Sequence, residues 1–167
     1  LSIIYRFLNL AAHPLLLNWF KNHVLLPLHK NRSIPHLRTL DMSKYFERRF
    51  LRVSAFAKAT STSLKSADIK SLGSMEQSHI KKSVEMLDAI SANDNLENQR
   101  DHFVILNENM VPIAMNINGT DAMLYVQKCP MANNNKGAIW LSHSKVIENP
   151  YFGEEMLSCG EVIYVIN

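Results

Sequence analysis

The apolar residues of this sequence change their spacing near Asn118-Gly119, and this change constrains the fold more than any other feature. Between Asp41 and Pro112 they recur at steps of three and four residues, which is the spacing of one helix face. After Gly119 this spacing disappears, and four of the five glycines lie between Gly119 and Gly160. We therefore predict a mainly α, α+β fold, in which a bundle of about four helices carries a small, irregular, β-containing C-terminal cap over residues 119–167.

The helices and strands of this fold can be placed from local signals. The clearest apolar stripe consists of Ile80, Val84, Leu87 and Ile90, and Ser74 with Gln77 in front of it has the pattern of a capping box. The predicted helices run from about Phe46 to the Thr60–Ser63 cluster, from Leu64 to Leu72, from Met75 to Ala92, and from the start signal Asp94 with Glu97 to Pro112. The predicted strands are Ala122–Lys128, Ala138–Leu141 and Glu161–Ile166.

Residues 1–40 differ in composition from the rest of the chain. They contain five basic residues and no acidic one, and three prolines interrupt every apolar run. Three interpretations stay open: an export leader without a clean cleavage site, a basic segment at an anionic lipid surface, and an extension or non-native segment that does not fold with the domain. We assign no function to this segment and expect residues 41–167 to form a single domain.

The charge balance and the lack of certain motifs exclude several function classes. The 18 Lys plus Arg against 15 Asp plus Glu leave a net charge of +3, and no basic stripe with aromatic residues accompanies it, so no nucleic-acid partner is expected. The uncharged run Phe7–Phe20 is shorter than the roughly 20 residues of a transmembrane helix, so no membrane span is expected either. No phosphate-binding glycine loop and no nucleophile with a fixed base are visible, which predicts a protein that is not an enzyme.

Four sulfur-containing residues form the most distinctive pattern of the cap. Cys129 and Met131 share one face of an extended chain, because residues i and i+2 point the same way. Met156 and Cys159 are neighbours in a helical turn, where residues i and i+3 lie together. Thiolate and thioether ligands select Cu(I), or its heavier relative Ag(I), over hard ions. A closed soft-metal site made of these four residues is the first hypothesis.

Other interpretations of the same residues stay open. The methionines can be gap-filling core residues while Cys129 and Cys159 form a disulfide, or the two cysteines can bind Zn²⁺ together with His143. The aromatic residues between the two sulfur pairs either shield a metal site from water or fill a small core: Trp140, Tyr151 and Phe152.

Three segments resemble a bacterial domain family of unknown function. They are NLENQRDHF (95–103), LYVQKCPMANNNKGAIWLS (124–142) and IENPYFGEEMLSCGEV (147–162). The family occurs alone in cell-envelope proteins and at the C-terminus of CusB-like membrane-fusion subunits of copper/silver efflux systems. The resemblance is specific from Asn95 to Val162 and loose from about Tyr45 to Ser91. Lys128 departs from the family pattern, in which an aromatic residue is usual there, and no leader or lipid-attachment cysteine is recognisable.

The resemblance implies a helical domain that handles a heavy metal, copper above all, in the periplasm or elsewhere in the cell envelope. The family's sulfur motif maps onto Cys129, Met131, Met156 and Cys159 without a gap. The expected function is that of a Cu(I) or Ag(I) carrier, buffer or efflux accessory, with efflux-system proteins as partners. The alternative belongs to another class: a structural or protein-interaction domain that is closed by a Cys129–Cys159 disulfide and holds no metal.

Overall fold

The computed structural model describes residues 42–116, 123–152 and 156–166, with side chains described from Val53 onward. The residues 1–40, to which the three open interpretations refer, lie outside this part. The described elements are α3 (Met42–Lys65), α4 (Ser74–Ala92), α5 (Leu96–Asn116), β1 (Leu124–Cys129), α6 (Ala132–Asn135), β2 (Ala138–Ser142) and β3 (Glu161–Ile166). No described helix combines the length and the apolar character that a membrane crossing requires.

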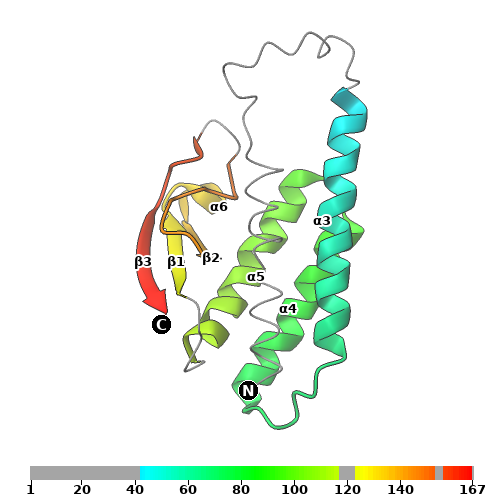
Figure 1. Ribbon diagram of the computed structural model, residues 1–167, viewed down its shortest axis with the longest axis vertical. Helices are drawn as coiled ribbons and strands as arrows, with labels where there is room; N and C mark the ends of the chain where they lie inside the picture. Colours follow the sequence, from blue (N-terminus) through cyan, green and yellow to red (C-terminus); the bar gives the residue numbers. More distant parts are fainter. Residues whose placement is uncertain (1–41, 117–122, 153–155, 167) are drawn as a thin grey trace.

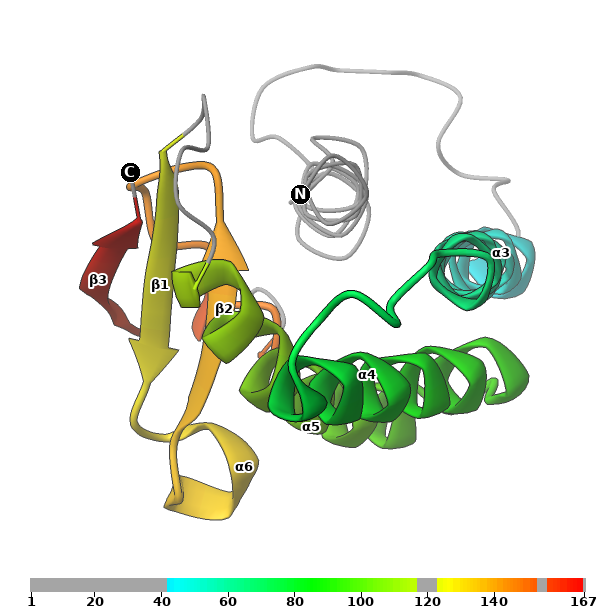
Figure 2. The same ribbon diagram turned by 90° about the horizontal axis from the view of Figure 1, so that it is seen from below.

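The three long helices and the three strands form a continuous row in which each packs on its neighbour. Helix α3 packs on α4, α4 on α5, and α5 on β2, after which the strand order is β2-β1-β3. Figure 1 shows the helices on one side of the molecule and the sheet on the other, and Figure 2 shows the same row end-on. The predicted α+β class, with helices first and a small sheet at the C-terminus, is confirmed.

The apolar stripes that predicted the helices do form the core. On α4, Ile80, Leu87 and Ile90 are buried, and Val84 is half-buried against them. The corresponding positions of α5 and α3 are buried as well: Gln99, Phe103, Leu106, Met110, Val53 and Ala57. Burying each large apolar side chain contributes about 1.5–3 kcal/mol, so this interface between the helices holds the domain together.

One predicted helix does not form, since α3 extends from Met42 to Lys65 and the residues after it are turns. The expected helix from Leu64 to Leu72 is therefore wrong. In its place Asp68 Oδ1 accepts a hydrogen bond from the backbone N–H of Lys70 at 3.1 Å, and the N–H of Leu72 bonds to the carbonyl of Ile69 at 3.1 Å. A side chain that bonds to the backbone in this way competes with helix formation.

The helix caps also differ from the expected ones. Ser74 is the first residue of α4 and Gly73 is its N-cap, so the predicted capping box of Ser74 and Gln77 is wrong. Gln77 instead donates from Nε2 to the carbonyl of Leu72 at 2.8 Å. At the start of α5 the cap is Asn95, not Asp94, because Asn95 Oδ1 accepts the N–H of Asn98 at 3.1 Å.

Helix α5 continues through Pro112 to Asn116, although the sequence pattern predicts that it ends at the proline. Proline removes one helical hydrogen bond and normally disrupts a helix interior. Here the residues around it, Val111, Ile113 and Ala114, are all buried. Their packing holds the last turn in place despite the missing bond.

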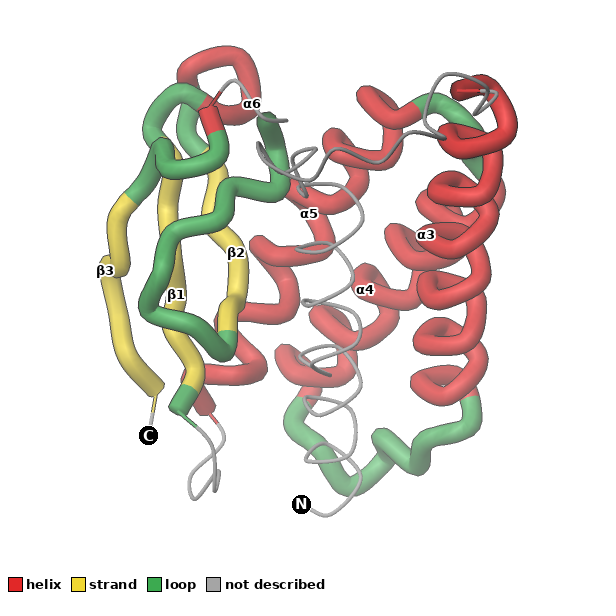
Figure 3. The backbone as a smooth tube through the Cα atoms, turned by 45° about the horizontal axis from the view of Figure 1, so that its top comes forward, coloured by secondary structure: helices red, strands yellow, loops and turns green. Residues whose placement is uncertain are grey.

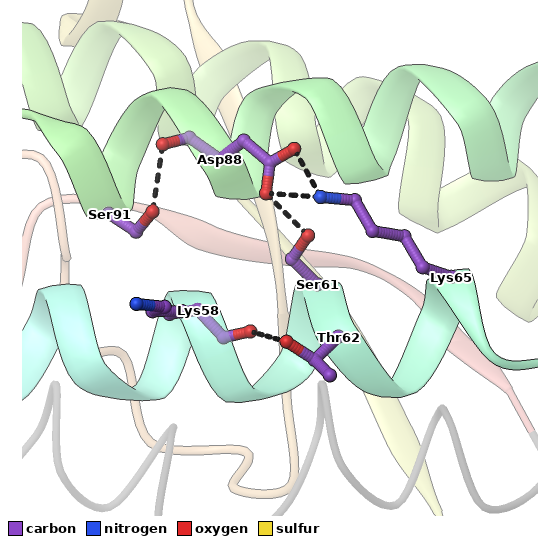
Figure 4. Close-up of polar contacts among 6 residues, drawn as sticks. All are labelled: Lys58, Ser61, Thr62, Lys65, Asp88 and Ser91. Carbon is purple, nitrogen blue, oxygen red and sulfur yellow. Dashed lines mark hydrogen bonds and ion pairs between the residues drawn. The ribbon is translucent and has the colours of Figure 1, made fainter.

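A polar contact joins α3 to α4 beside the apolar interface. Asp88 on α4 accepts a 2.6 Å hydrogen bond from Ser61 and forms a 2.7 Å ion pair with Lys65, and both partners lie on α3 (Figure 4). The bond to Lys65, followed by that to Ser61, lowers the pKa of Asp88. The two helices are thus linked by a carboxylate that stays ionised at neutral pH.

The sheet is antiparallel and lies against α5 through its β2 edge. Strand β1 pairs with β2 on one side and with β3 on the other, with a register irregularity between Val126 and Gln127. Asn107 of α5 is buried, and its Oδ1 accepts the N–H of Leu141 in β2 at 3.3 Å. The helix therefore satisfies a main-chain donor of the β2 edge that would otherwise lack a partner.

The short element α6, which connects β1 to β2, is a left-handed turn. Asn133, Asn134 and Asn135 have φ angles of 55°, 54° and 63°. Asparagine tolerates this conformation better than other residues with a Cβ atom, apart from aspartate. The Asn-Asn-Asn run between β1 and β2 thus has a specific backbone reason.

Candidate functional site

Two cysteines that are far apart in the sequence meet at the end of the sheet. Strand β1 ends at Cys129, and β3 begins at Glu161, which pairs with Lys128. Because the strands are antiparallel, this register brings Cys159 beside Cys129. The two Sγ atoms lie 3.0 Å apart, and both cysteines are free thiols. The fold therefore creates a dithiol pair from two separate segments.

The two thiols differ in their surroundings. Cys129 is completely buried, whereas Cys159 is half-buried, in the loop that leads into β3. The hydrogen bond with Cys129, with burial as a smaller contribution, raises the pKa of Cys159. Cys159 is thus a protonated thiol at neutral pH, and any metal that binds it must displace that proton.

The methionines of the predicted site occupy less buried positions. Met131 is 48% exposed and adopts a helical backbone conformation, since the extended chain ends at Cys129. The alternation that was expected to align Met131 with Cys129 therefore stops at Cys129, two residues before Met131. Met156 is half-buried in a tight turn, where its carbonyl accepts the N–H of Cys159 at 3.1 Å. This i,i+3 turn has the local geometry predicted for Met156 and Cys159.

A loop after β2 covers the face of β1 that carries the buried cysteine. We call residues 143–152 the strap; Figure 3 shows it in green, running from the end of β2 back along the sheet. Gln127 lies two residues before Cys129 on the same strand face and is completely buried. Its Nε2 donates to the carbonyls of Ser144 at 2.8 Å and Val146 at 3.3 Å. The Gln127 amide thus fastens the first half of the strap to the sheet.

A second buried amide fastens the other half of the strap to the cysteine loop. Asn149 is completely buried, and its Nδ2 donates to the carbonyl of Cys159 at 2.8 Å. Its backbone N–H donates to the carbonyl of Leu157 at 2.7 Å, and its Oδ1 accepts the N–H of Tyr151 at 2.9 Å. Asn149 therefore holds the main chain of Cys159 at the position where its thiol meets Cys129.

Aromatic rings pack together close to the loop that carries Cys159 and Gly160. Trp140 and Tyr151 are buried and meet edge to face with centroids 6.0 Å apart, and Phe103 of α5 lies 5.8 Å from the Tyr151 ring. The Tyr151 hydroxyl donates to the carbonyl of Ile139 at 2.6 Å, and burial raises its pKa far above the ordinary value. Phe152 is half-buried against the core. Trp140 and Tyr151 therefore form an apolar, uncharged wall.

Gly160, the neighbour of Cys159, has to be a glycine. Its φ is +144°, and a Cβ atom there would lie 2.8 Å from the carbonyl oxygen of Lys128 and 2.9 Å from Cη2 of Trp140. The close approach of the backbone to β1 and to the indole leaves no space for a side chain. This contact sets the distance at which Cys159 passes the end of β1.

The sequence reasoning identified the two cysteines but missed Gln127, Asn149 and Gly160 as the residues that position them. A signal existed for Gln127, which is a polar residue directly after the apolar run Leu124–Val126. The pair Asn149-Pro150 by itself indicates only a turn, and nothing in a local pattern indicates that the Asn149 amide reaches Cys159, ten residues further along the chain.

The structure does not bring together the three ligands of the zinc alternative. Among the described residues, no three His, Cys, Asp or Glu side chains come together in the way a metal site of those ligands needs. The alternative required Cys129, Cys159 and His143 in one cluster. His143 is half-buried in the strap, and its Nε2 is buried without a hydrogen-bond partner within the described part of the chain.

Comparison with known protein families gives a match to part of the chain. A family model described as a protein of unknown function, DUF3347, matches residues 50–122, which is less than half of the chain. The matched segment contains most of α3 and all of α4 and α5, and it ends before Cys129. Neither the curated proteins nor the solved structures gave a match. The helical part is thus similar to a domain of unknown function, and the match ends before the first strand, β1.

Proposed function

We propose that this domain binds a soft monovalent ion, Cu(I) or Ag(I), through Cys129 and Cys159 and acts as a metal carrier, buffer or efflux accessory. The observation that supports the proposal is the approach of the two thiols to 3.0 Å at the end of the sheet. Two thiolates in an apolar setting are the ligand set that soft metals prefer, and their two negative charges offset the charge of the ion.

Binding requires the pair to open. An ion with bonds of about 2.3 Å to each thiolate, the length of zinc–sulfur bonds, needs sulfurs farther apart than 3.0 Å for any wide bond angle. Cys129 is held in a central strand, whereas Cys159 lies in a loop before β3. Cys159 is therefore the thiol that moves outward when the ion enters.

The methionines would complete the site from its open side. Met131 is exposed and Met156 half-buried, so both thioethers lie nearer to solvent than Cys129. A thioether is neutral and binds soft ions weakly, which suits ligands that exchange when the ion is passed to another protein. Trp140 and Tyr151 would limit the access of water behind the two thiolates.

The place of action is proposed on a different basis. The resemblance of residues 95–162 to a domain of cell-envelope and efflux proteins supports a periplasmic or envelope address, with efflux-system proteins as partners. The domain would then capture ions on the outer side of the inner membrane and deliver them by ligand exchange.

A competition titration tests the proposal. The reduced protein is titrated with Cu(I) against a coloured Cu(I) chelator, beside Cys129→Ser, Cys159→Ser and the double variant Met131→Leu/Met156→Leu. We expect one ion per chain, loss of capture in both serine variants and weaker capture in the double variant. Met75→Leu is the matched control, because Met75 is 67% exposed on α4, which does not carry the site. Failure of the reduced wild type to compete for Cu(I) contradicts the proposal.

The same distance favours a second candidate function, a structural or interaction domain closed by a Cys129–Cys159 disulfide. Sulfurs at 3.0 Å need only a small side-chain rotation to reach the bond length of about 2.05 Å. This candidate does not use the methionines, so the double Met→Leu variant would leave it unchanged. Mass spectrometry under non-reducing conditions would show the loss of two hydrogen atoms and a Cys129–Cys159 crosslinked peptide.

A further inference from the structure

We infer that Cys129 and Cys159 form one reversible redox couple, in which the half-buried Cys159 reacts first and the resulting disulfide closes the metal site. The inference deepens the proposed function, and its gating step rests on that function. It differs from a permanent structural disulfide because it requires that the pair pass between two states within the folded domain.

The distance between the Sγ atoms of Cys129 and Cys159 is compatible with a pair that has two states. A disulfide needs about 2.05 Å between the sulfurs, and a shared ion needs more than the observed 3.0 Å. The observed pair lies between these two arrangements. Either can therefore be reached by rotating the Cys159 side chain, without separating β1 from β3.

The backbone is held in place beside both Cys129 and Cys159. Lys128 pairs with Glu161 next to Cys129, and Asn149 Nδ2 holds the carbonyl of Cys159 at 2.8 Å. Gly160 allows the chain to pass close to β1, with the carbonyl of Lys128 and the Trp140 ring as its neighbours. With these points held, the two thiols stay close in the reduced state and have a high effective concentration toward each other.

The two thiols differ in their exposure to solvent. Cys129 is completely buried, so a small disulfide cannot reach its sulfur in the folded protein. Cys159 is half-buried and open to attack. Reactivity of a thiol depends on access as well as on its ionisation, and buried structural cysteines are inert. Exposure therefore sets the order in which the two cysteines react.

The reaction is a thiol–disulfide exchange with a low-molecular-weight disulfide, RSSR, as the oxidant. The Cys159 thiolate attacks one sulfur of RSSR, the S–S bond of the reagent breaks, and one RS⁻ leaves and takes up the proton that Cys159 lost. Cys129 then gives up its proton and attacks Sγ of Cys159, which releases the second RSH. Two electrons pass from the cysteine pair to the reagent, and one protein disulfide and two small thiols are formed.

The disulfide removes both thiolates at once, so the site can no longer hold a soft ion. Conversely, an ion bound to both sulfurs occupies the electron pairs that attack a disulfide and should protect the pair from oxidation. Metal capture and oxidation therefore compete for the same two atoms.

The test uses glutathione disulfide as the oxidant and the full chain. The reduced wild type, Cys129→Ser and Cys159→Ser are incubated with it, quenched with acid and mapped by mass spectrometry. We expect the wild type to form the Cys129–Cys159 bond without accumulating an adduct. The Cys129→Ser variant should trap a stable glutathione adduct on Cys159. The Cys159→Ser variant should form an adduct on Cys129 at a rate at least about tenfold lower. Equal reactivity of the two variants, or an adduct formed faster on Cys129, overturns the inference.

A measurement on the wild type guards against variants that fail to fold. Limiting iodoacetamide is added to the reduced protein, and the alkylated cysteine is identified by peptide mapping. We expect Cys159 to be modified about tenfold faster than Cys129, with equal rates after unfolding in guanidinium. Equal rates in the folded protein overturn the proposed order of reaction.

Two further arms separate this inference from the proposed function. Cu(I) is added before glutathione disulfide, and the oxidised protein is titrated with Cu(I) against the chelator. Protection by the ion and loss of capture after oxidation are the expected results. If the oxidised protein captures Cu(I) as well as the reduced one, the gating step is wrong while metal binding stands. If the reduced protein captures no Cu(I), the proposed function fails and the gating step with it, whereas the order of reaction is decided by the adducts.

Discussion

Asn149 donates a hydrogen bond of 2.8 Å from its side-chain amide to the main-chain carbonyl of Cys159, and it does so from a completely buried position. Its Oδ1 accepts a hydrogen bond from the backbone N–H of Tyr151, and its backbone N–H donates to the carbonyl of Leu157. One amide thus joins the strap to the loop that carries the second cysteine. The position of that cysteine opposite Cys129 depends on a residue with no sulfur chemistry of its own.

Replacement of Asn149 by alanine should loosen the cysteine loop. The change removes two buried hydrogen bonds and leaves the carbonyl of Cys159 without its partner, which costs about 2–3 kcal/mol of unfolding free energy. The free energy of unfolding is measured by urea denaturation followed by circular dichroism. Asn98→Ala, at an exposed position of α5, is the control and should change it by less than about 0.5 kcal/mol. A loss for Asn149→Ala no larger than the control's would show that the amide does not hold the loop.

Alanine at Gly160 should be among the most damaging small changes in the cap. The new Cβ atom would lie 2.8 Å from a main-chain oxygen, and the φ of +144° disfavours any L side chain, so we expect a loss of about 2 kcal/mol or more. Gly73→Ala is the matched control: it faces only the flexible side chain of Glu76 and has a φ of −62°, and it should cost less than about 1 kcal/mol. Thermal unfolding of both variants measures the difference, and equal losses would contradict the close packing at Gly160.

The ion pair between α3 and α4 predicts an acid-dependent loss of stability. Hydrogen bonds from Lys65 and Ser61 hold the pKa of Asp88 below its ordinary value of 3.8. The stabilisation is therefore fully present above that value, and it is lost as the pH falls from 3.8 toward the lower pKa of the folded state. Asp88→Asn should flatten the pH dependence of the unfolding midpoint in this acidic range.

The exposed Asp101→Asn on α5 is the control for this measurement, and its pH profile should follow that of the wild type. Because about half of the Asp88 side chain is exposed, at 47%, the effect is expected to be modest and to shrink in high salt. An unchanged acid slope in Asp88→Asn would show that this carboxylate does not link the two helices.

The cap of α5 distinguishes the sequence expectation from the structure. Asn95 Oδ1 accepts the N–H of Asn98, so Asn95→Ala should destabilise the protein by about 1 kcal/mol. Asp94, which the sequence pattern favoured as the start signal, should tolerate the same change with a smaller effect. Urea denaturation of the two variants decides between them, and a larger loss for Asp94→Ala would mean that the predicted cap is the correct one.

Local patterns were sufficient for most of the architecture. The stripe of Ile80, Leu87 and Ile90 predicted α4, and the short strand-like runs after Gly119 predicted three strands that the structure contains. These elements depend on interactions between residues close in the sequence, which repeat with the period of the helix or strand. The start and the end of α5 were misjudged. Asn95, not Asp94, accepts the helix N–H, and the buried residues around Pro112 carry the helix through the proline.

The candidate site was predictable only as a set of residue types. The sequence by itself determined that two thiols and two thioethers lie in a small, turn-rich cap. Only the tertiary structure decided that Cys129 and Cys159 meet at 3.0 Å, that one is buried and the other half-buried, and that Met131 faces solvent. The reason is physical: these distances follow from the pairing of β1 with β3, from the space left by Gly160 and from the buried amides of Gln127 and Asn149. Each of these acts between segments that no local period connects.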